Sequence, residues 1–201
     1  MITIHNFPRG SRGLRVYWQC EEMGLSYRLE AVSFPPSEAY RALHPLGSVP
    51  FLEDEGGVAI NESIAMMLYL AQKYGPTPLL PDKDDPTLAR VLQMTVFGET
   101  AIGMNLNPML EAKFVAPESD KRNWSVMGQQ ARVERAIRYA DDMLGTHPFI
   151  AGPNFTLADI SMSCALGIWR GAFGGVLSEN LAAYRERLAA RPAYQRAAKA
   201  Q

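Results

Sequence analysis

Cysteine and histidine are scarce in this 201-residue chain. The two cysteines, Cys20 and Cys164, lie in apolar surroundings and form no Cys-x-x-Cys pair, which argues against a disulfide framework, a dithiol redox pair and a zinc cluster. The three histidines, His5, His44 and His147, are too scattered along the chain to indicate a metal site. We therefore expect a protein without a metal cofactor.

An excess of charge and a long hydrophobic run are also missing. The chain has 20 Lys+Arg against 21 Asp+Glu, so it offers no electrostatic basis for binding nucleic acid or an anionic membrane. The apolar stretch Ile160–Trp169 is far shorter than the ~20 residues of a bilayer span, and Met1–Phe7 lacks the features of a secretory signal. These absences favour a cytoplasmic protein with neither nucleic-acid nor membrane partners.

The first 75 residues alternate between strand-like and helical patterns. The order is β-α-β-α-β-β-α, in which the first strand-helix-strand unit is a parallel crossover and Glu55-Gly56-Gly57 closes an antiparallel hairpin. Strands are predicted at 2–7, 27–32, 51–54 and 58–60, and helices at 14–24, at 37–43 and after Ser63, where Ile64, Met67, Leu68 and Ala71 form an apolar stripe. The pattern predicts a small mixed sheet with helices packed on it.

Proline marks a change after residue 75. Residues 75–86 carry four prolines and few apolar residues, as a linker does. Beyond them the periodicity is helical only, and one helical face collects Val133, Ala136, Ile137, Ala140, Met143 and Leu144. We therefore predict an α/β domain at 1–75, a linker at 76–86 and an all-helical domain at 87–201.

One helix start in the second half has a purely structural signature. Thr156 and Asp159 stand at the two positions of a capping box, and Phe155 and Ile160 stand at those of a hydrophobic staple. The four residues predict a helix that begins inside the core of the helical domain.

Two turns of the α/β part are suited to binding a ligand. Val49-Pro50 stands directly before a strand, where a cis bond would expose the Val49 backbone, although trans is the commoner state of X-Pro bonds. Ser11 lies in the turn from the first strand to the first helix, where a hydroxyl faces whatever binds above the strand's end. Helix capping is the alternative role for Ser11.

A third candidate is the helix start Asn61-Glu62-Ser63. The free N–H groups and positive dipole of a helix N-terminus favour a carboxylate, and here Ser63 adds a donor while Glu62 offers a partner for an amine. Simple capping by Asn61, with Glu62 compensating the dipole, explains the same residue types. The local sequence leaves both interpretations open.

Four segments carry a family resemblance when they are taken together and in order. They are Ser11-Arg12-Gly13-Leu14-Arg15-Val16, Gly47-Ser48-Val49-Pro50-Phe51-Leu52, Glu62-Ser63-Ile64-Ala65 and Phe155-Thr156-Leu157-Ala158-Asp159-Ile160. With them the chain resembles, over essentially its full length, a cytosolic glutathione S-transferase of the bacterial, serine-containing type. The resemblance implies a thioredoxin-like N-terminal domain, an all-helical C-terminal domain for substrate binding and dimerisation, and a homodimer.

The resemblance also implies roles in binding glutathione as a substrate. The backbone of Val49, next to a cis-Pro50 and preceded by Ser48, would pair with the cysteinyl part. Glu62 and Ser63 would hold the γ-glutamyl group.

The thiol is the group that such a site must activate. Ser11 would donate a hydrogen bond to the glutathione sulfur, which stabilises the thiolate. Arg12 is the alternative catalytic residue, acting on the thiolate by its charge.

The sequence departs from the family pattern at several points. No cysteine stands at or beside Ser11, which argues against thiol-transferring members, and the Ser-Ser-Cys element of the isomerase branch is absent. Ser48 stands where a lysine is often seen, so the glycyl carboxylate of glutathione has no obvious cation; His44 and Arg12 are candidates.

The expected function is conjugation of reduced glutathione to an electrophilic apolar small molecule. Met94, Met104 and Met109 are suited either to a deformable substrate pocket or to helical core packing. Two alternatives stay open. One is a non-enzymatic binding or assembly module with the same fold, and the other is a glutathione-dependent peroxide or disulfide reductase.

Overall fold

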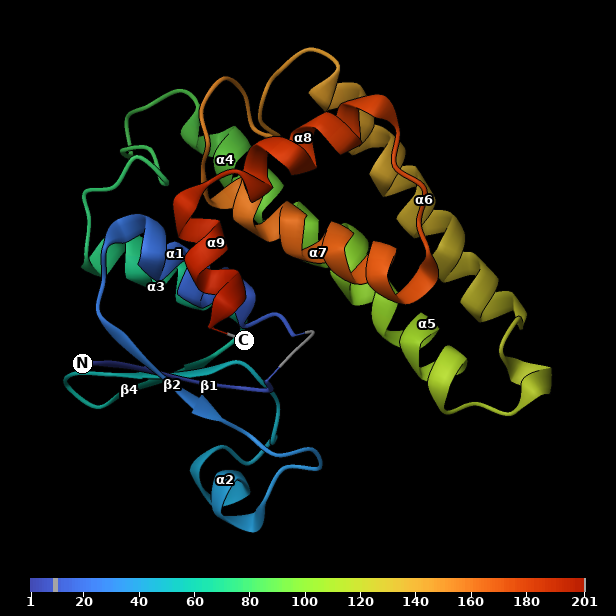
Figure 1. The fold of residues 1–201 in the computed structure, drawn as a ribbon, viewed down its shortest axis with the longest axis horizontal. Helices are drawn as coiled ribbons and strands as arrows, with labels where there is room; N and C mark the ends of the chain where they lie inside the picture. Colours follow the sequence, from blue (N-terminus) through green and yellow to red (C-terminus); the bar gives the residue numbers. More distant parts are fainter. Residues whose placement is uncertain (9–10, 201) are drawn as a thin grey trace. The chain divides into compact units, whose positions relative to one another are not determined.

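The computed structural model describes residues 1–8 and 11–200 of the chain (Figure 1). Arg9 and Gly10, which belong to the turn discussed above for Ser11, lie outside the described residues. Two compact units are formed, one by Met1–Leu80 together with the C-terminal segment that begins at Ala189, the other by Pro81–Leu188.

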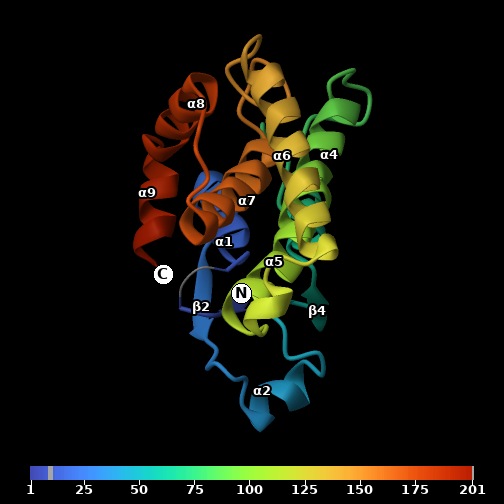
Figure 2. The same ribbon diagram turned by 90° about the vertical axis from the view of Figure 1, so that its right-hand side faces the viewer.

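The first unit is a mixed four-stranded sheet with helices on both faces, and its elements follow the predicted order. They are β1 (Ile2–Asn6), α1 (Leu14–Met23), β2 (Tyr27–Ala31), α2 (Glu38–Leu43), β3 (Phe51–Asp54), β4 (Val58–Asn61) and α3 (Ser63–Lys73). The strand order is β2-β1-β3-β4, with β1 and β2 parallel and the other pairs antiparallel. Helices α1 and α3 cover one face and α2 lies on the other (Figures 1 and 2). The thioredoxin-like prediction for this part is confirmed.

The two helices on the shared face are anchored by apolar side chains. In α1 the residues Val16, Trp18 and Cys20 are fully buried, and Gly24 ends the helix with a φ of 65°, a conformation that glycine adopts without strain. Burial, which disfavours the charged thiolate, raises the pKa of Cys20 to about 12. Cys20 is therefore an inert core residue, as its sequence context predicts.

The prediction for the buried face of α3 is partly wrong. Met67 and Ala71 are buried as expected, but Ile64 and Leu68 are only half-buried, and the inner face consists of Ser63, Met66, Met67, Leu70 and Ala71. The face is rotated by about one residue because the helix starts with the side chain of Ser63 turned inward. A polar residue thus takes the first inward position of this helix.

Helix α9 (Pro192–Lys199) packs on α1 within the first unit. The rings of Trp18 and Tyr194 meet edge to face with centroids 4.8 Å apart, and Arg191 contacts both carboxylate oxygens of Glu22 at 2.6 and 2.7 Å. These contacts join the end of the chain to its beginning. The domain limits predicted from the sequence follow chain order and remain a prediction.

The second unit is helical throughout its described elements. It contains α4 (Leu88–Phe97), the π-helical turn η1 (Gly98–Gly103), α5 (Met104–Phe114), the short η2 (Glu118–Asp120), α6 (Trp124–Leu144), α7 (Leu157–Phe173) and α8 (Glu179–Ala189). Helix α7 packs against α4, η1 and α5. The predicted all-helical architecture is confirmed, and none of the described helices is long and apolar enough to cross a membrane.

The predicted capping box forms at the start of α7. The carboxylate of Asp159 accepts hydrogen bonds from the backbone N–H groups of Thr156 and Ile150, both at 2.8 Å, and from the hydroxyl of Tyr184 at 2.9 Å. Asp159 is completely buried, and this burial raises its pKa to about 6 although the hydrogen bonds act in the opposite direction. The capping box thus pairs the polar groups of this helix start within the protein.

Candidate functional site

The strand register brings the three predicted site segments to one edge of the sheet. Phe51 of β3 pairs with Asn61 of β4 and with His5 of β1. Pro50, which precedes Phe51, and Glu62, which follows Asn61, therefore leave the sheet at the same edge. The turn that carries Ser11 follows the end of β1 at this edge as well.

The turn before β3 has the backbone that the sequence suggests. The Val49-Pro50 peptide bond is cis, Pro50 is buried, Val49 is half-buried and Ser48 is exposed. Gly47 has a φ of 62°, which favours glycine. The main chain of Ser48 and Val49 is thus presented at the sheet edge.

The start of α3 is not capped in the way that the sequence first suggests. Asn61 is the last residue of β4, so the capping role considered for it is wrong; Glu62 occupies the N-cap position and makes no side-chain capping bond. Among the described residues Glu62 alone combines a side chain with a positive φ, 70°. Strained backbone of this kind costs about 1–3 kcal/mol and clusters at binding sites.

The side chain of Ser63 forms a hydrogen bond with α1. The guanidinium of Arg15, which is completely buried, donates to Ser63 Oγ at 3.1 Å. An oxygen that accepts from a guanidinium keeps its own hydrogen for another acceptor. The helix start therefore combines open N–H groups with a hydroxyl donor, which suits a carboxylate ligand.

Contacts of Ser11 join its turn to the end of β1. Its Oγ donates to Oδ1 of Asn6 at 2.5 Å and accepts from the N–H of Gly13 at 3.2 Å. Gly13 packs so closely on Asn6 that a Cβ there would lie 2.3 Å from the Asn6 side chain. The contacts agree with a turn-stabilising role, and a catalytic role requires the hydroxyl to turn from Asn6 to the sulfur.

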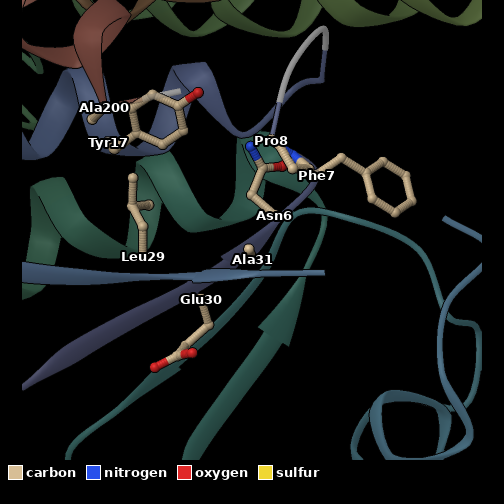
Figure 3. A pocket seen from close by; sticks show the side chains of 8 residues that line it. All are labelled: Asn6, Phe7, Pro8, Tyr17, Leu29, Glu30, Ala31 and Ala200. Carbon is tan, nitrogen blue, oxygen red and sulfur yellow. The ribbon is translucent and has the colours of Figure 1, made fainter. Parts of the chain in front are cut away.

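Asn6 contacts Ser11, and the sequence interpretation did not include it in the candidate site. It is buried at the end of β1, and it also lines a cavity of about 230 Å³ with Phe7, Pro8, Tyr17, Leu29 and Ala31 (Figure 3). Ligand pockets in proteins usually measure roughly 300–1,000 Å³, so this cavity is smaller than most of them. A buried polar side chain at the end of an apolar strand is the signal that could have drawn attention to it.

Two other sequence-based expectations change in the structure. His44, a candidate cation for the glycyl carboxylate, is buried, and its Nε2 lies 3.0 Å from Ser48 Oγ, inside the turn. Met94 and Met109 are core residues, whereas Met104 is 54% exposed. The core-packing alternative is therefore correct for Met94 and Met109.

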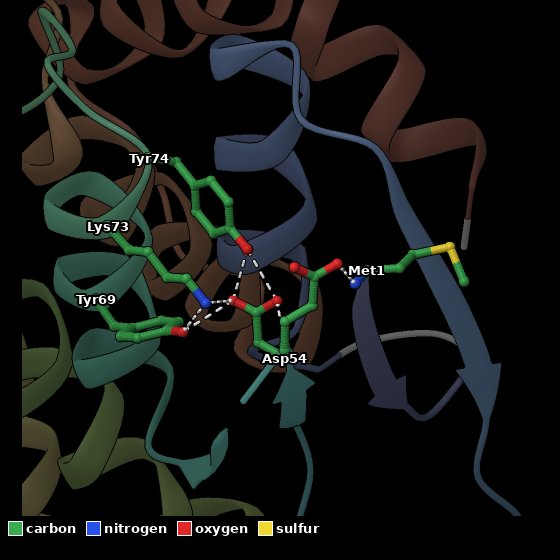
Figure 4. A network of polar contacts seen from close by, with 6 residues as sticks. Met1, Asp54, Tyr69, Lys73 and Tyr74 are labelled. Carbon is green, nitrogen blue, oxygen red and sulfur yellow. Dashed lines mark hydrogen bonds and ion pairs between the residues drawn. The ribbon is translucent and has the colours of Figure 1, made fainter. Parts of the chain in front are cut away.

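A second polar cluster lies at the far end of β3 (Figure 4). Asp54 accepts from Lys73 at 2.9 Å, from the hydroxyl of Tyr69 at 2.8 Å and from that of Tyr74 at 2.7 Å. Burial acts to raise the pKa of Asp54, but these donors and the N–H of Glu55 outweigh it and hold the pKa well below its usual range. Because protein donors occupy the carboxylate oxygens of Asp54, the cluster has a structural role: it holds α3 against the sheet.

Metal coordination finds no support in this geometry. Within residues 1–8 and 11–200 no group of three or more His, Cys, Asp and Glu side chains is arranged to hold a metal ion. The donors that the sheet edge does offer are hydroxyl, guanidinium and backbone N–H groups, which fit an anionic organic ligand.

A thioredoxin-like sheet followed by a helical unit defines a class of two-part proteins that includes the glutathione S-transferases, and the sequence comparisons agree. The model of the glutathione S-transferase N-terminal domain matches residues 11–73, and that of the C-terminal domain matches residues 85–190. The chain therefore belongs to the glutathione S-transferase family.

The similar proteins include glutathione S-transferases and a translation elongation factor. Glutathione S-transferase GstA of Escherichia coli O157:H7 is 27% identical over 97% of this chain and 96% of its own length. The theta-class glutathione S-transferase of Xanthomonas axonopodis pv. citri, solved with glutathione bound, is 27% identical with a TM-score of 0.76, covering 98% of this chain and 96% of its own. Elongation factor 1-gamma of Artemia salina is 29% identical over 81% of this chain and 37% of its own length.

Proposed function

We propose that the protein binds reduced glutathione at the sheet edge and conjugates it, through its sulfur, to a small apolar electrophile. The observation that carries the proposal is the start of α3, where Glu62 has a positive φ without capping the helix and Ser63 accepts from Arg15. In this proposal the α-carboxylate of the γ-glutamyl group accepts from the open N–H groups and from Ser63, and its amine contacts the carboxylate of Glu62.

The middle of the tripeptide pairs with the turn before β3. The N–H and carbonyl groups of Val49 form strand-like hydrogen bonds with the cysteinyl residue, next to cis-Pro50, and Ser48 borders the site. Because the register places this turn beside the start of α3, one extended tripeptide contacts both segments. The glutathione-bound theta-class relative supports glutathione as the ligand.

The thiol is activated at the turn that follows β1. A free thiol has a pKa of about 8.5 and is only a few per cent thiolate at neutral pH. A hydrogen bond from Ser11 stabilises the thiolate, and the charge of Arg12 is the alternative source of the same effect. The thiolate then forms a carbon–sulfur bond with the electrophile, which either releases a leaving group or takes up a proton after addition.

The experiment has two measurements. The thiolate absorbance of the glutathione complex is titrated against pH, and the conjugation rate is measured for the same proteins. Ser11→Ala is expected to raise the apparent thiol pKa and to slow conjugation about ten- to hundredfold near neutral pH, since a hydrogen bond to a charged acceptor contributes about 1.5–3 kcal/mol. An unshifted titration in Ser11→Ala with a shifted one in Arg12→Ala would transfer the role to Arg12. Absence of any thiolate signal would contradict conjugation.

A second function is favoured by one comparison. The similarity to elongation factor 1-gamma raises the alternative of a non-enzymatic binding or assembly module. Retention on immobilised glutathione without conjugate formation would favour that alternative, and oxidised glutathione without conjugate would indicate a peroxide or disulfide reductase. A homodimer in the cytoplasm remains part of the proposal, to be checked by sedimentation and by fractionation of cells.

A further inference from the structure

Two buried side chains hold the turn that carries Val49. The hydroxyl of Tyr40, in α2, donates to the main-chain carbonyl of Ser48 at 2.7 Å. His44, which follows α2, places Nε2 3.0 Å from Ser48 Oγ. Ser48 is itself exposed, whereas Tyr40 and His44 are 7% and 6% exposed. An exposed residue of the site is thus held from inside the protein, at both its main chain and its side chain.

The rings of the same two residues fix the ends of the turn. His44 stacks on Phe51, the first residue of β3, with ring centroids 4.7 Å apart and planes 8° apart. Tyr40 and Phe51 belong to one buried apolar cluster, against which Val49 packs. Because His44 precedes the turn and Phe51 follows it, this stacking closes the loop that contains Ser48 and Val49.

Peptide geometry gives the phenol contact a directional consequence. The carbonyl of Ser48 and the N–H of Val49 belong to one planar trans peptide unit and point in opposite directions. A donor that holds the carbonyl of Ser48 toward the protein interior therefore directs the N–H of Val49 away from the interior. Tyr40 sets the direction of the Val49 N–H without touching it.

We propose that Tyr40 and His44 are positioning residues that orient the Ser48–Val49 peptide for pairing with the cysteinyl part of glutathione. The inference rests on the proposed function, because it concerns the same site. Burial also raises the pKa of Tyr40 to about 12, so the phenol keeps its proton and remains a donor throughout the neutral range. A turn that is already ordered in the free protein lowers the free-energy cost of ordering it when the ligand binds.

The first test separates positioning from chemistry. Tyr40→Phe removes only the hydroxyl and keeps the ring in its cluster. Loss of one neutral hydrogen bond predicts that the Kd and KM for glutathione rise about three- to tenfold, whereas kcat at saturating glutathione stays within about twofold. Tyr27→Phe is the matched control, since it removes a hydroxyl that donates to Glu21 at 2.9 Å; it is expected to leave all three constants unchanged.

The second test examines the His44 contact by rescue. His44→Phe preserves an aromatic ring over Phe51 but removes the nitrogen near Ser48, and it is expected to raise the Kd for glutathione about threefold. His44→Gln supplies a hydrogen-bonding group at a similar reach and is expected to recover part of that loss. Equal affinities in the wild type and His44→Phe would remove His44 from the proposal.

Amide hydrogen exchange provides a readout that a general loss of stability would not reproduce. In the free protein, Tyr40→Phe is expected to speed exchange at Gly47, whose N–H donates to the carbonyl of His44 at 2.8 Å within the turn, while exchange in β1 stays unchanged. A wild-type protein that binds glutathione, together with a Tyr40→Phe variant of equal affinity and equal Gly47 exchange, would overturn this inference alone. A wild-type protein that does not bind glutathione would overturn the proposed function and this inference with it.

Discussion

Helices α3 and α7 begin in opposite ways. At α7 the side chain of Thr156 accepts from the N–H of Asp159. In return, the fully buried carboxylate of Asp159 accepts from the N–H groups of Thr156 and Ile150 and from the hydroxyl of Tyr184. At α3 the N-cap residue Glu62 is exposed, has a φ of 70° and caps nothing.

We propose that the difference separates a helix start with a structural role, at α7, from one that binds a ligand, at α3. Sequence and structure agree at α7, where the capping residues form the bonds that they are suited for. They disagree at α3, where the side chain of Glu62 could cap the helix but does not. The first N–H groups of α3 are left open, and the backbone of Glu62 is strained. Such disagreement is expected at functional sites. Substitutions at the start of α7 should therefore lower stability, whereas those at the start of α3 should lower glutathione affinity.

The largest expected effect follows from Asp159→Ala. The substitution leaves buried donors on Ile150, Thr156 and Tyr184 without their acceptor, and each unsatisfied buried donor costs about 1–3 kcal/mol. We expect the free energy of unfolding to fall by about 3–5 kcal/mol, as measured by urea denaturation. A loss below about 1 kcal/mol would show that this carboxylate does not hold the helix start.

The pH dependence of stability sharpens the same contrast. Burial raises the pKa of Asp159 to about 6, whereas an aspartate in the unfolded chain titrates near 3.9. Between about pH 4 and pH 6 the folded protein therefore holds a proton that the unfolded chain has released, and the free energy of unfolding should fall as the pH rises through this window. Asp159→Asn should lack this fall, so parallel profiles for the two proteins would contradict the raised pKa.

At the start of α3 the expected effect is on affinity. Glu62→Gln together with Ser63→Ala should weaken glutathione binding about ten- to hundredfold. Ser63→Ala removes one charge-assisted bond of about 1.5–3 kcal/mol, whereas the glutamine oxygen can still accept from the amine. Turnover at saturating glutathione should suffer less. Asn123→Ala is the control, since Asn123 caps α6 in the ordinary way; it should cost about 1 kcal/mol of stability and no affinity. Unchanged calorimetric affinity in the double variant would return Glu62 and Ser63 to a structural role.

The smallest expected effect concerns backbone strain. Glu62→Gly removes the side chain that makes a φ of 70° unfavourable, and should raise the free energy of unfolding by about 1 kcal/mol. Glu62→Ala loses the same carboxylate but keeps the strain, so the two variants should lose glutathione affinity equally and differ in stability. Equal stabilities would mean that the start of α3 is unstrained.

Local patterns were sufficient to predict most of the fold. The β-α-β-α-β-β-α order, the hairpin at Glu55-Gly56-Gly57 and the capping box of α7 depend on neighbouring residues only, and the structure confirms them. The packing of α9 on α1 was not predicted, because the contacts of Trp18 with Tyr194 and of Glu22 with Arg191 join opposite ends of the chain.

The sequence was sufficient to select the segments that meet at the candidate site, but not to predict their contacts. The sequence indicated Val49-Pro50, Glu62 and Ser63, and the strand register places their segments at one edge of the sheet. Asn6 and Tyr40 were missed, because their polar atoms act on Ser11 and Ser48 through contacts that only the folded chain creates. Local sequence also could not show that Asn61 ends a strand instead of capping a helix.

The central claim is that the open start of α3 receives the α-carboxylate of the γ-glutamyl group. Calorimetric titration of the wild-type protein and Ser63→Ala with glutathione, and with an analogue that lacks this carboxylate, tests it directly. We predict that the wild type binds glutathione at least about tenfold more tightly than the analogue and that Ser63→Ala narrows the difference. Equal affinities of the wild type for the two ligands, or no binding of glutathione, would contradict the claim.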